Sequence, residues 1–318
     1  IIRRDSKDYE ENNLGKEDIL SVFKNAFEYK KNRALRPTKD LIGQSWGMLF
    51  YKNSTRTKVS FEVGIRELGG DPVLLDLSST QIGRGESIED TAKVLSRFLD
   101  GLIVRAHGHE IIKEFAQYSE IPVINALTDF LHPCQIYADC MTILEKTGSS
   151  LNPYNGLKGK KLAFFGDTSC NMANSWILAG ALWDMDIWLS GPEEFKPSPE
   201  IETFCKNANL PIRWKYTQDC KEAAQNADIL YTDVWVSMGY EKEENDRKKK
   251  MARYQVTQDL LYQAKENSFF MHCMPTHSGE EVTQEVLSSP RSILYDQAEN
   301  RLHMQKAIMK QLSQNNIS

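Results

Sequence analysis

The stretch Gly47-Met48-Leu49-Phe50-Tyr51-Lys52-Asn53-Ser54-Thr55-Arg56-Thr57 decides the fold of this chain. It joins an apolar run to the amphipathic run 59–65, so it predicts a strand, a tight turn and a helix. Ser and Thr are preferred caps at such a helix start, but the unpaired N–H groups and the helix dipole also favour an anion there. Because the Arg56 side chain can bind phosphate oxygens in a bidentate manner, we expect a phosphate-binding turn.

Apolar runs and helical patterns alternate along the whole chain. Strands are expected in the first half at 47–51, 72–77, 101–105 and 122–125, and in the second half at 161–167, 186–190, 229–232 and 268–271. A long helix is expected from Pro133 to about Gly148. This alternation predicts an α/β fold with two similar domains, each a parallel sheet flanked by helices. The turn-rich segment 151–156 is the best candidate for a linker, which gives domains at 1–149 and 150–299.

Composition narrows the class of protein. A chain of 318 residues is too long for one ordinary core, and 41% hydrophobic with 26% charged residues is typical of a globular protein. The net charge of −5 argues against a nucleic-acid partner, and no apolar run reaches the length of a membrane span. Six Cys without a CxxC pair indicate reduced thiols and a cytoplasmic location. Because the first residue is Ile1 rather than Met, a missing transit peptide, and with it an organellar location, stays open.

In the first half, polar residues at strand ends are the candidate site residues, because ligands of open α/β sheets bind beyond the carboxyl ends of strands. Arg105 ends the third expected strand, and His132 and Gln135 flank Pro133 at a helix start. Each has an ordinary structural explanation when taken alone. Together with residues 54–57 they form a set of convergent hydrogen-bond donors, which suits an oxyanion next to a phosphate.

The second half carries different chemistry. Asp233 follows the strand at 229–232 and could either hold an ammonium group or cap a helix. The turn at 166–171 resembles that of dinucleotide-binding proteins, but the GxGxxG spacing is absent and NAD binding is not expected. Cys273 ends the last strand and is either a small buried hydrophobe or a pocket residue. The charged run 241–250 is expected to be a solvated loop or helix face.

Together these segments resemble the aspartate/ornithine transcarbamylase family, from about residue 40 to the end of the chain. Residues 54–57 look like the family's carbamoyl-phosphate signature, and residues 132–135 match its HPxQ motif. Gln81 matches a loop that in this family reaches the site of a neighbouring subunit. Asp233 with Ser237-Met238-Gly239 is similar to the DxxxSMG motif of ornithine-type members, and residues 272–275 are similar to their HCLP motif. Arg301 matches the family's last carbamoyl-phosphate contact.

The resemblance implies the reaction of carbamoyl phosphate with L-ornithine to give L-citrulline and phosphate, without a metal or an organic cofactor. The catalytic residues that it implies are Arg56, Arg105, His132 and Cys273. The implied carbamoyl-phosphate-binding residues are Ser54, Thr55, Arg56, Thr57, Gln81, Arg105, His132, Gln135, Cys273, Met274 and Arg301. The implied ornithine-binding residues are Leu127, Asn171, Asp233, Ser237 and Met238.

The resemblance also implies an assembly and leaves alternatives open. The family implies a homotrimer, or a multiple of trimers, and a C-terminal helix at about 300–318 that returns to the first domain. The chain departs from the family pattern in an apparent one-residue insertion at 166–171, in Met274 for a common Leu and in Ser278 for a common Arg. A carbamoyltransferase for another amine, such as putrescine or an acylated ornithine, and a non-catalytic carbamoyl-phosphate-binding paralogue remain as alternatives. The sequence does not distinguish a biosynthetic from a catabolic role.

Overall fold

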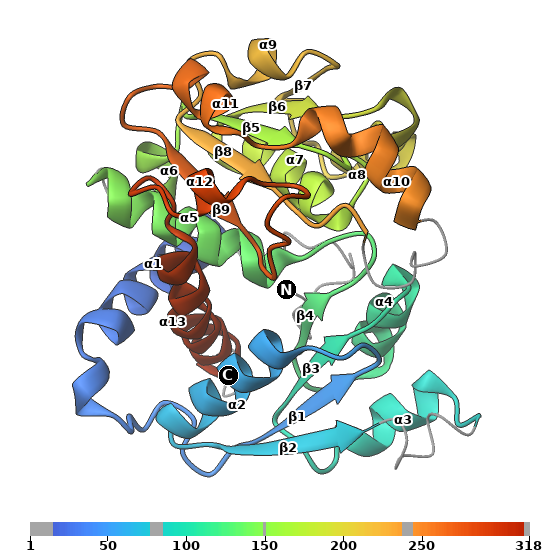
Figure 1. Ribbon diagram of the computed structural model, residues 1–318. Coiled ribbons are helices and arrows are strands. Elements are labelled where there is room, and N and C mark those ends of the chain that lie inside the picture. The colour runs from blue at the N-terminus through green and yellow to red at the C-terminus, as the bar shows by residue number, and fades with distance from the viewer. Residues whose placement is uncertain (1–14, 77–84, 149–150, 237–243, 315–318) are drawn as a thin grey trace. The chain divides into compact units, whose positions relative to one another are not determined.

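The computed structural model describes residues 15–76, 85–148, 151–236 and 244–314, which belong to two compact units (Figure 1). The first unit takes its described residues from 1–152 and 299–318, and the second from 153–298. The predicted α/β class is confirmed, because each unit contains one parallel sheet with helices beside it. Within the described ranges, no helix is long and apolar enough to cross a membrane.

The sheet of the first unit has four parallel strands in the order β2-β1-β3-β4. Its strands are β1 (Ser45–Phe50), β2 (Asp71–Asp76), β3 (Gly101–Arg105) and β4 (Val123–Leu127), each within two residues of the predicted bounds. All residues of β3 and β4 are buried, as expected for strands covered on both faces, whereas β2 at the edge is largely exposed.

Helices cover this sheet, and one of them comes from the C-terminal part of the chain. They are α1 (Lys16–Lys31), α2 (Thr55–Glu67), α3 (Ile88–Leu95), α4 (His109–Tyr118), α5 (Pro133–Thr147) and α13 (Leu294–Gln314), with the short 3-10 helix η1 (Arg33–Leu35) after α1. From Glu299 on, α13 belongs to the first unit, which confirms the predicted return of the C-terminal helix. A buried ion pair joins Lys306 of α13 to Glu67 of α2, with Nζ 2.9 Å from Oε2.

The starts of α2 and α5 follow from local sequence. Ser54 caps α2, because its Oγ accepts a hydrogen bond from the Thr57 N–H at 3.2 Å. Pro133 occupies the first turn of α5, where its missing N–H costs nothing, and Gly148 ends the helix with a left-handed φ of 60°. Both helix N-termini therefore follow directly on strand ends or on the short loops after them.

The second unit contains a five-stranded parallel sheet in the order β7-β6-β5-β8-β9. Its strands are β5 (Lys161–Phe165), β6 (Asp186–Ser190), β7 (Trp214–Thr217), β8 (Ile229–Thr232) and β9 (Phe269–His272). Its helices are α6 (Pro153–Gly156), α7 (Asn171–Trp183), η4 (Glu193–Phe195), α8 (Pro199–Asn207), α9 (Cys220–Ala224), α10 (Glu244–Met251), η6 (Ala252–Tyr254), α11 (Gln258–Gln263) and α12 (Gln284–Leu287). The segment predicted to be a linker contains the single helical turn α6, whose first residue is a Pro.

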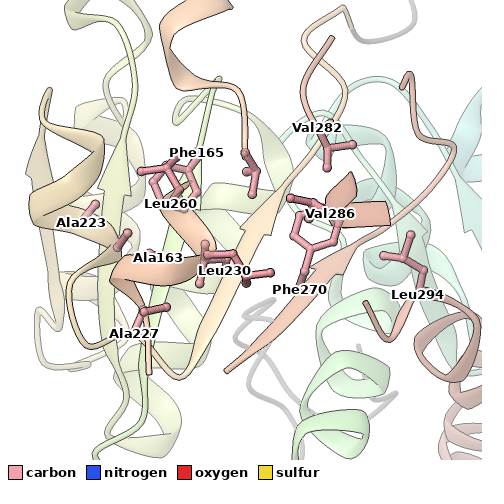
Figure 2. Close-up of a cluster of buried hydrophobic side chains, with 14 residues drawn as sticks. Ala163, Phe165, Ala223, Ala227, Leu230, Leu260, Phe270, Val282, Val286 and Leu294 are labelled. Atoms are coloured by element: carbon pink, nitrogen blue, oxygen red, sulfur yellow. The ribbon is translucent and has the colours of Figure 1, made fainter. Parts of the chain in front are cut away.

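A core of buried apolar side chains lies against one face of this second sheet (Figure 2). Phe165 of β5, Leu230 of β8 and Phe270 of β9 contribute from the sheet. Leu260 of α11 and Val286 of α12 pack against them. This packing fixes β5, β8 and β9 beside one another, and the loops after these three strands carry the second group of predicted site residues.

Candidate active site

Three predicted site residues from distant parts of the chain, Thr57, Arg105 and Arg301, are in contact in the first unit. The Thr57 Oγ1 accepts hydrogen bonds from Arg301 Nη2 at 2.6 Å and from Arg105 Nη1 at 3.5 Å. Arg105 is the last residue of β3, and Arg301 lies in the second turn of α13. Arg105 is 9% exposed and Arg301 is 3% exposed. Two nearly buried guanidinium groups at one helix N-terminus form a strong site for an anion.

His132 belongs to the same cluster. It precedes α5 as its N-cap and is 5% exposed. Burial, followed by the charges of Arg301 and Arg105, holds the pKa of His132 well below its usual value. The imidazole is therefore neutral at pH 7 and can donate one N–H to an oxygen without carrying a charge itself.

The other described site residues predicted for the first unit lie at helix starts or at the end of a strand. Thr55 opens α2, directly after the cap Ser54, and Arg56 follows it with a partly buried side chain. Gln135 lies in the first turn of α5, and Leu127 is the last residue of β4. Gln81, Ser237 and Met238 lie outside the described residues.

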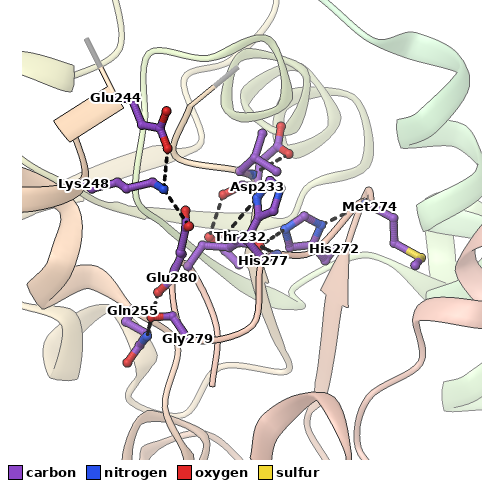
Figure 3. Close-up of polar contacts among 12 residues, drawn as sticks. Thr232, Asp233, Glu244, Lys248, Gln255, His272, Met274, His277, Gly279 and Glu280 are labelled. Carbon is purple, nitrogen blue, oxygen red and sulfur yellow. Dashed lines mark hydrogen bonds and ion pairs between the residues drawn. The ribbon is translucent and has the colours of Figure 1, made fainter. Parts of the chain in front are cut away.

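In the second unit, Cys273 and Met274 follow β9 directly. Figure 3 shows the contact between His272, the last residue of β9, and Met274. The backbone N–H of Met274 donates to His272 Nδ1 at 2.8 Å, and Met274 has a left-handed φ of 59°. His272 Nε2 lies 3.3 Å from Glu281 Oε1, and both side chains are fully buried. We infer that His272 carries its proton on Nε2, because Nδ1 accepts from the backbone.

Asp233 and Cys273 are 40 positions apart but in contact. The Cys273 thiol donates to Asp233 Oδ1 at 2.9 Å, and the Val234 N–H donates to the same oxygen at 2.7 Å. The contact arises because β8 and β9 are neighbours in the sheet, so that the residues after each strand meet. Asp233, His272 and Cys273 each offer one potential metal ligand within 4.8 Å of the others, but both ring nitrogens of His272 already face other groups.

Asn171 is the first residue of α7, in the turn where the sequence departs from the family pattern. Gly166 has a φ of 105°, and a Cβ on it would come within 3.2 Å of the Trp235 ring, so the turn requires glycine. The N-cap Cys170 is partly buried, and desolvation of its thiol, with the nearby charges of Asp167 and Asp233, holds its pKa well above the usual value. The turn and the segment after β8 are therefore packed together, with a neutral thiol between them.

The charged run 241–250 was expected to be a solvated loop or helix face, and most of its described residues are exposed on α10, but Arg247 is an exception. Arg247 of α10 is 4% exposed: its Nε donates to the Trp235 backbone carbonyl at 2.9 Å, and its Nη2 forms an ion pair with Asp167. Its guanidinium also stacks on Phe195, 4.5 Å from the ring centroid. Helical spacing explains the difference, since Arg247 and Met251 are one turn apart and are the two buried residues of this helix. Arg247, Asp167 and Glu281 were not predicted as site residues, because no short motif contains both partners of these contacts.

Two α/β units, the first with two guanidinium groups at a helix N-terminus, are the arrangement expected of a protein that binds an anionic ligand. Residues 9–145 match the carbamoyl-P binding domain of the aspartate/ornithine carbamoyltransferases, and residues 158–312 match their Asp/Orn binding domain. The chain therefore belongs to the aspartate/ornithine carbamoyltransferase family.

Similar proteins agree with this assignment. The ornithine carbamoyltransferase of Methanoculleus marisnigri is 43% identical over 94% of both chains, and that of Methanosphaera stadtmanae is 48% identical over 85% of this chain and 88% of the relative. Among solved structures, ornithine carbamoyltransferase from Pyrococcus furiosus superimposes with a TM-score of 0.84 at 41% identity, covering 92% of each chain. The anabolic enzyme of Campylobacter jejuni gives a TM-score of 0.85 at 35% identity, covering 95% of this chain and 97% of the other.

Proposed function

We propose that this chain transfers the carbamoyl group of carbamoyl phosphate to the δ-amine of L-ornithine, giving L-citrulline and phosphate. The observation that carries the proposal is the buried cluster of Thr57, Arg105, His132 and Arg301 in the unit matched by the carbamoyl-P binding domain. In this proposal residues 1–149 and about 300–318 form the donor domain, and residues 150–299 form the acceptor domain. Relatives named ornithine carbamoyltransferase at 43–48% identity support the choice of acceptor.

The donor would bind by its phosphate at the start of α2. Ser54, Thr55 and Thr57 offer hydroxyl and backbone N–H groups there, and Arg56 and Arg105 offer guanidinium donors. The helix dipole adds a partial positive charge at the same place. This environment stabilises the phosphate as a leaving group, because its developing negative charge meets donors that are already oriented.

The reaction requires attack of a neutral amine on the carbamoyl carbon. Arg105, Thr57 and the neutral His132 would donate hydrogen bonds to the carbonyl oxygen as it becomes a tetrahedral oxyanion. Collapse of this intermediate breaks the C–O bond to phosphate, and the proton of the amine leaves with the departing phosphate or to solvent. Gln135 and the carbonyls of Cys273 and Met274 would accept hydrogen bonds from the carbamoyl NH2 group, and Arg301, which can only donate, would contact an oxygen of the same ligand. Holding both reactants in place accounts for much of the rate, because effective molarities of about 10⁵ M or more are attainable.

Replacing His132 with leucine, which has no hydrogen-bond donor, tests the protonation state that burial gives this residue. Since the pKa of His132 is well below 6.5, its ionisation causes no change in kcat/KM between pH 6 and 8. We expect the variant to lower kcat/KM about 100-fold, as for loss of one oxyanion donor, with a pH profile of unchanged shape. Initial rates across this pH range provide the measurement. A wild-type inflection near pH 6.5 that disappears in the variant would contradict the neutral imidazole.

The acceptor residues of the proposal are Leu127, Asn171, Asp233, Ser237 and Met238. The Asp233 carboxylate suits the α-ammonium of ornithine, because opposite charges attract strongly in a partly buried site. We therefore expect rapid carbamoylation of L-ornithine and little of putrescine, which lacks the α-carboxylate, or of N-acetylornithine, whose α-nitrogen carries no charge. Comparing initial rates with these amines and with aspartate tests the proposal. Preference for any other amine over ornithine would disprove the acceptor assignment.

We further propose that the working form is a homotrimer, or a multiple of trimers, in a cytoplasmic or organellar compartment. The edge strand β2 exposes Val73 and Leu74, and an exposed apolar edge strand is a ready surface for another copy of the chain. In this assembly Gln81 would contribute to the site of a neighbouring subunit. Each of the six cysteines is a thiol, in keeping with a reducing compartment. Sedimentation of active enzyme on dilution tests the assembly, and full activity in a monomer would contradict it.

A further inference from the structure

The Gln135 side chain is hydrogen-bonded to Asp139 on the same helix. Its Nε2 donates to Asp139 Oδ1 at 2.8 Å, and the two residues are one turn apart in α5. Gln135 is 1% exposed and Asp139 is fully buried. The other amide atom, Gln135 Oε1, is also buried and has no hydrogen-bond partner among the residues that the structure describes.

This contact fixes which way round the amide lies. Asp139 Oδ1 lies against the NH2 end of the Gln135 amide, which is the orientation that a carboxylate, as an acceptor of hydrogen bonds, favours. The reversed amide would bring two oxygen atoms together in a buried place and leave the NH2 group without this partner. Because the two ends of an amide point in different directions, Oε1 faces away from Asp139. Gln135 lies in the first turn of α5, directly after the N-cap His132 of the anion-binding cluster.

We propose that Asp139 is a positioning residue that makes the donor site selective for a substrate with an NH2 group. This inference rests on the proposed function and deepens it. By holding Nε2, Asp139 presents Oε1 as a buried acceptor beside the anion-binding cluster. A carbamoyl NH2 satisfies this acceptor, whereas the methyl group of acetyl phosphate, which carries the same phosphate and carbonyl, leaves it unpaired. A site with a buried polar group discriminates strongly against an analogue that lacks the matching group.

The test replaces Asp139 with asparagine, which keeps the shape but can donate as well as accept. The Gln135 amide can then turn round and present a donor to the substrate NH2. We expect KM for carbamoyl phosphate to rise about tenfold, while Ki for acetyl phosphate as a competitive inhibitor stays the same or falls. If Asp139→Asn folds poorly, Asp139→Ser serves as the second variant, because its hydroxyl can also both donate and accept. It must likewise raise the ratio of KM for carbamoyl phosphate to Ki for acetyl phosphate.

Two further variants separate positioning from a general structural role. In a Gln135→Met background, Asp139→Asn should cause no further rise in KM, because Asp139 acts through the amide that is gone. Thr142→Val is the matched control on the same helix, because it removes the buried hydrogen bonds that the Thr142 hydroxyl makes with Ala138 and Asn300. It should lower stability but leave the ratio of KM for carbamoyl phosphate to Ki for acetyl phosphate unchanged.

The outcomes distinguish this inference from the proposed function. A wild-type enzyme that forms no citrulline would overturn the proposed function itself. If the wild type is active but Asp139→Asn weakens the binding of both ligands equally, or of neither, the inference alone is overturned. Selective loss of carbamoyl phosphate binding that disappears in the Gln135→Met background is the result that we expect.

Discussion

Replacing Arg105 with methionine is expected to lower kcat/KM for carbamoyl phosphate about 10²- to 10³-fold, the usual cost of one preorganised donor at a developing oxyanion. Methionine keeps the apolar stem of the side chain and removes only the guanidinium. Arg105 is nearly buried at the end of β3, and its Nη1 lies 3.5 Å from Thr57 Oγ1, so solvent cannot replace it easily. Arg105→Lys should recover only part of the loss, because an ammonium lacks the fork that binds two oxygens.

A matched control for Arg105 is Arg97→Met in the same unit. The Arg97 side chain is 73% exposed and lies 3.8 Å from Glu120, an arrangement typical of a weak surface ion pair. This control should retain full activity. An Arg105→Met enzyme that keeps more than a tenth of the wild-type kcat/KM would remove Arg105 from the proposed oxyanion site.

Replacing Arg247 with methionine is expected to destabilise the protein by about 3–5 kcal/mol, the usual cost of leaving one partner of a buried ion pair without the other. Asp167 would remain buried without its counterion, and the Trp235 carbonyl would lose its donor. Asp167 lies in the turn before Asn171, and Trp235 lies two residues after Asp233. The substitution should therefore destabilise both segments that carry proposed ornithine-binding residues. We therefore also expect KM for ornithine to rise more than KM for carbamoyl phosphate.

Urea unfolding of three variants tests this account of Arg247. Lys249→Met, on the exposed side of the same helix, should change the free energy of unfolding by no more than about 0.5 kcal/mol. Combining Asp167→Asn with Arg247→Met should cost less than the sum of the single changes, because each removes the same interaction. Strict additivity, or an Arg247→Met protein as stable as the wild type, would show that the pair does not stabilise the unit.

Sequence patterns predicted this fold well where burial is complete. The bounds of β3 were predicted without error, and β4 within two residues, because a strand covered on both faces is a continuous apolar run. β7 was not predicted, since it has four residues, lies at the edge of its sheet and is only partly buried. The helical turn α6 was missed because Pro and Gly in a short segment indicate a turn as readily as a helix start.

The candidate site was predictable in part, for a different reason. Residues such as Arg105 and His132 stand at strand ends and helix starts, where local sequence signals the position. The partners that orient site residues give no such signal. Arg247 and Asp167 are 80 positions apart and form a pair only after the second unit folds. Asp139 is four positions from Gln135, but its role depends on burial and on the orientation of an amide, which the sequence does not show.

The proposed reaction joins the carbamoyl group of the donor to ornithine, and it is measured most directly by its products. Purified protein is incubated with carbamoyl phosphate and L-ornithine, and citrulline and inorganic phosphate are quantified together. The account predicts one citrulline for each phosphate released, with phosphate release depending on ornithine. Phosphate release without citrulline, or no turnover by correctly folded protein, would contradict it.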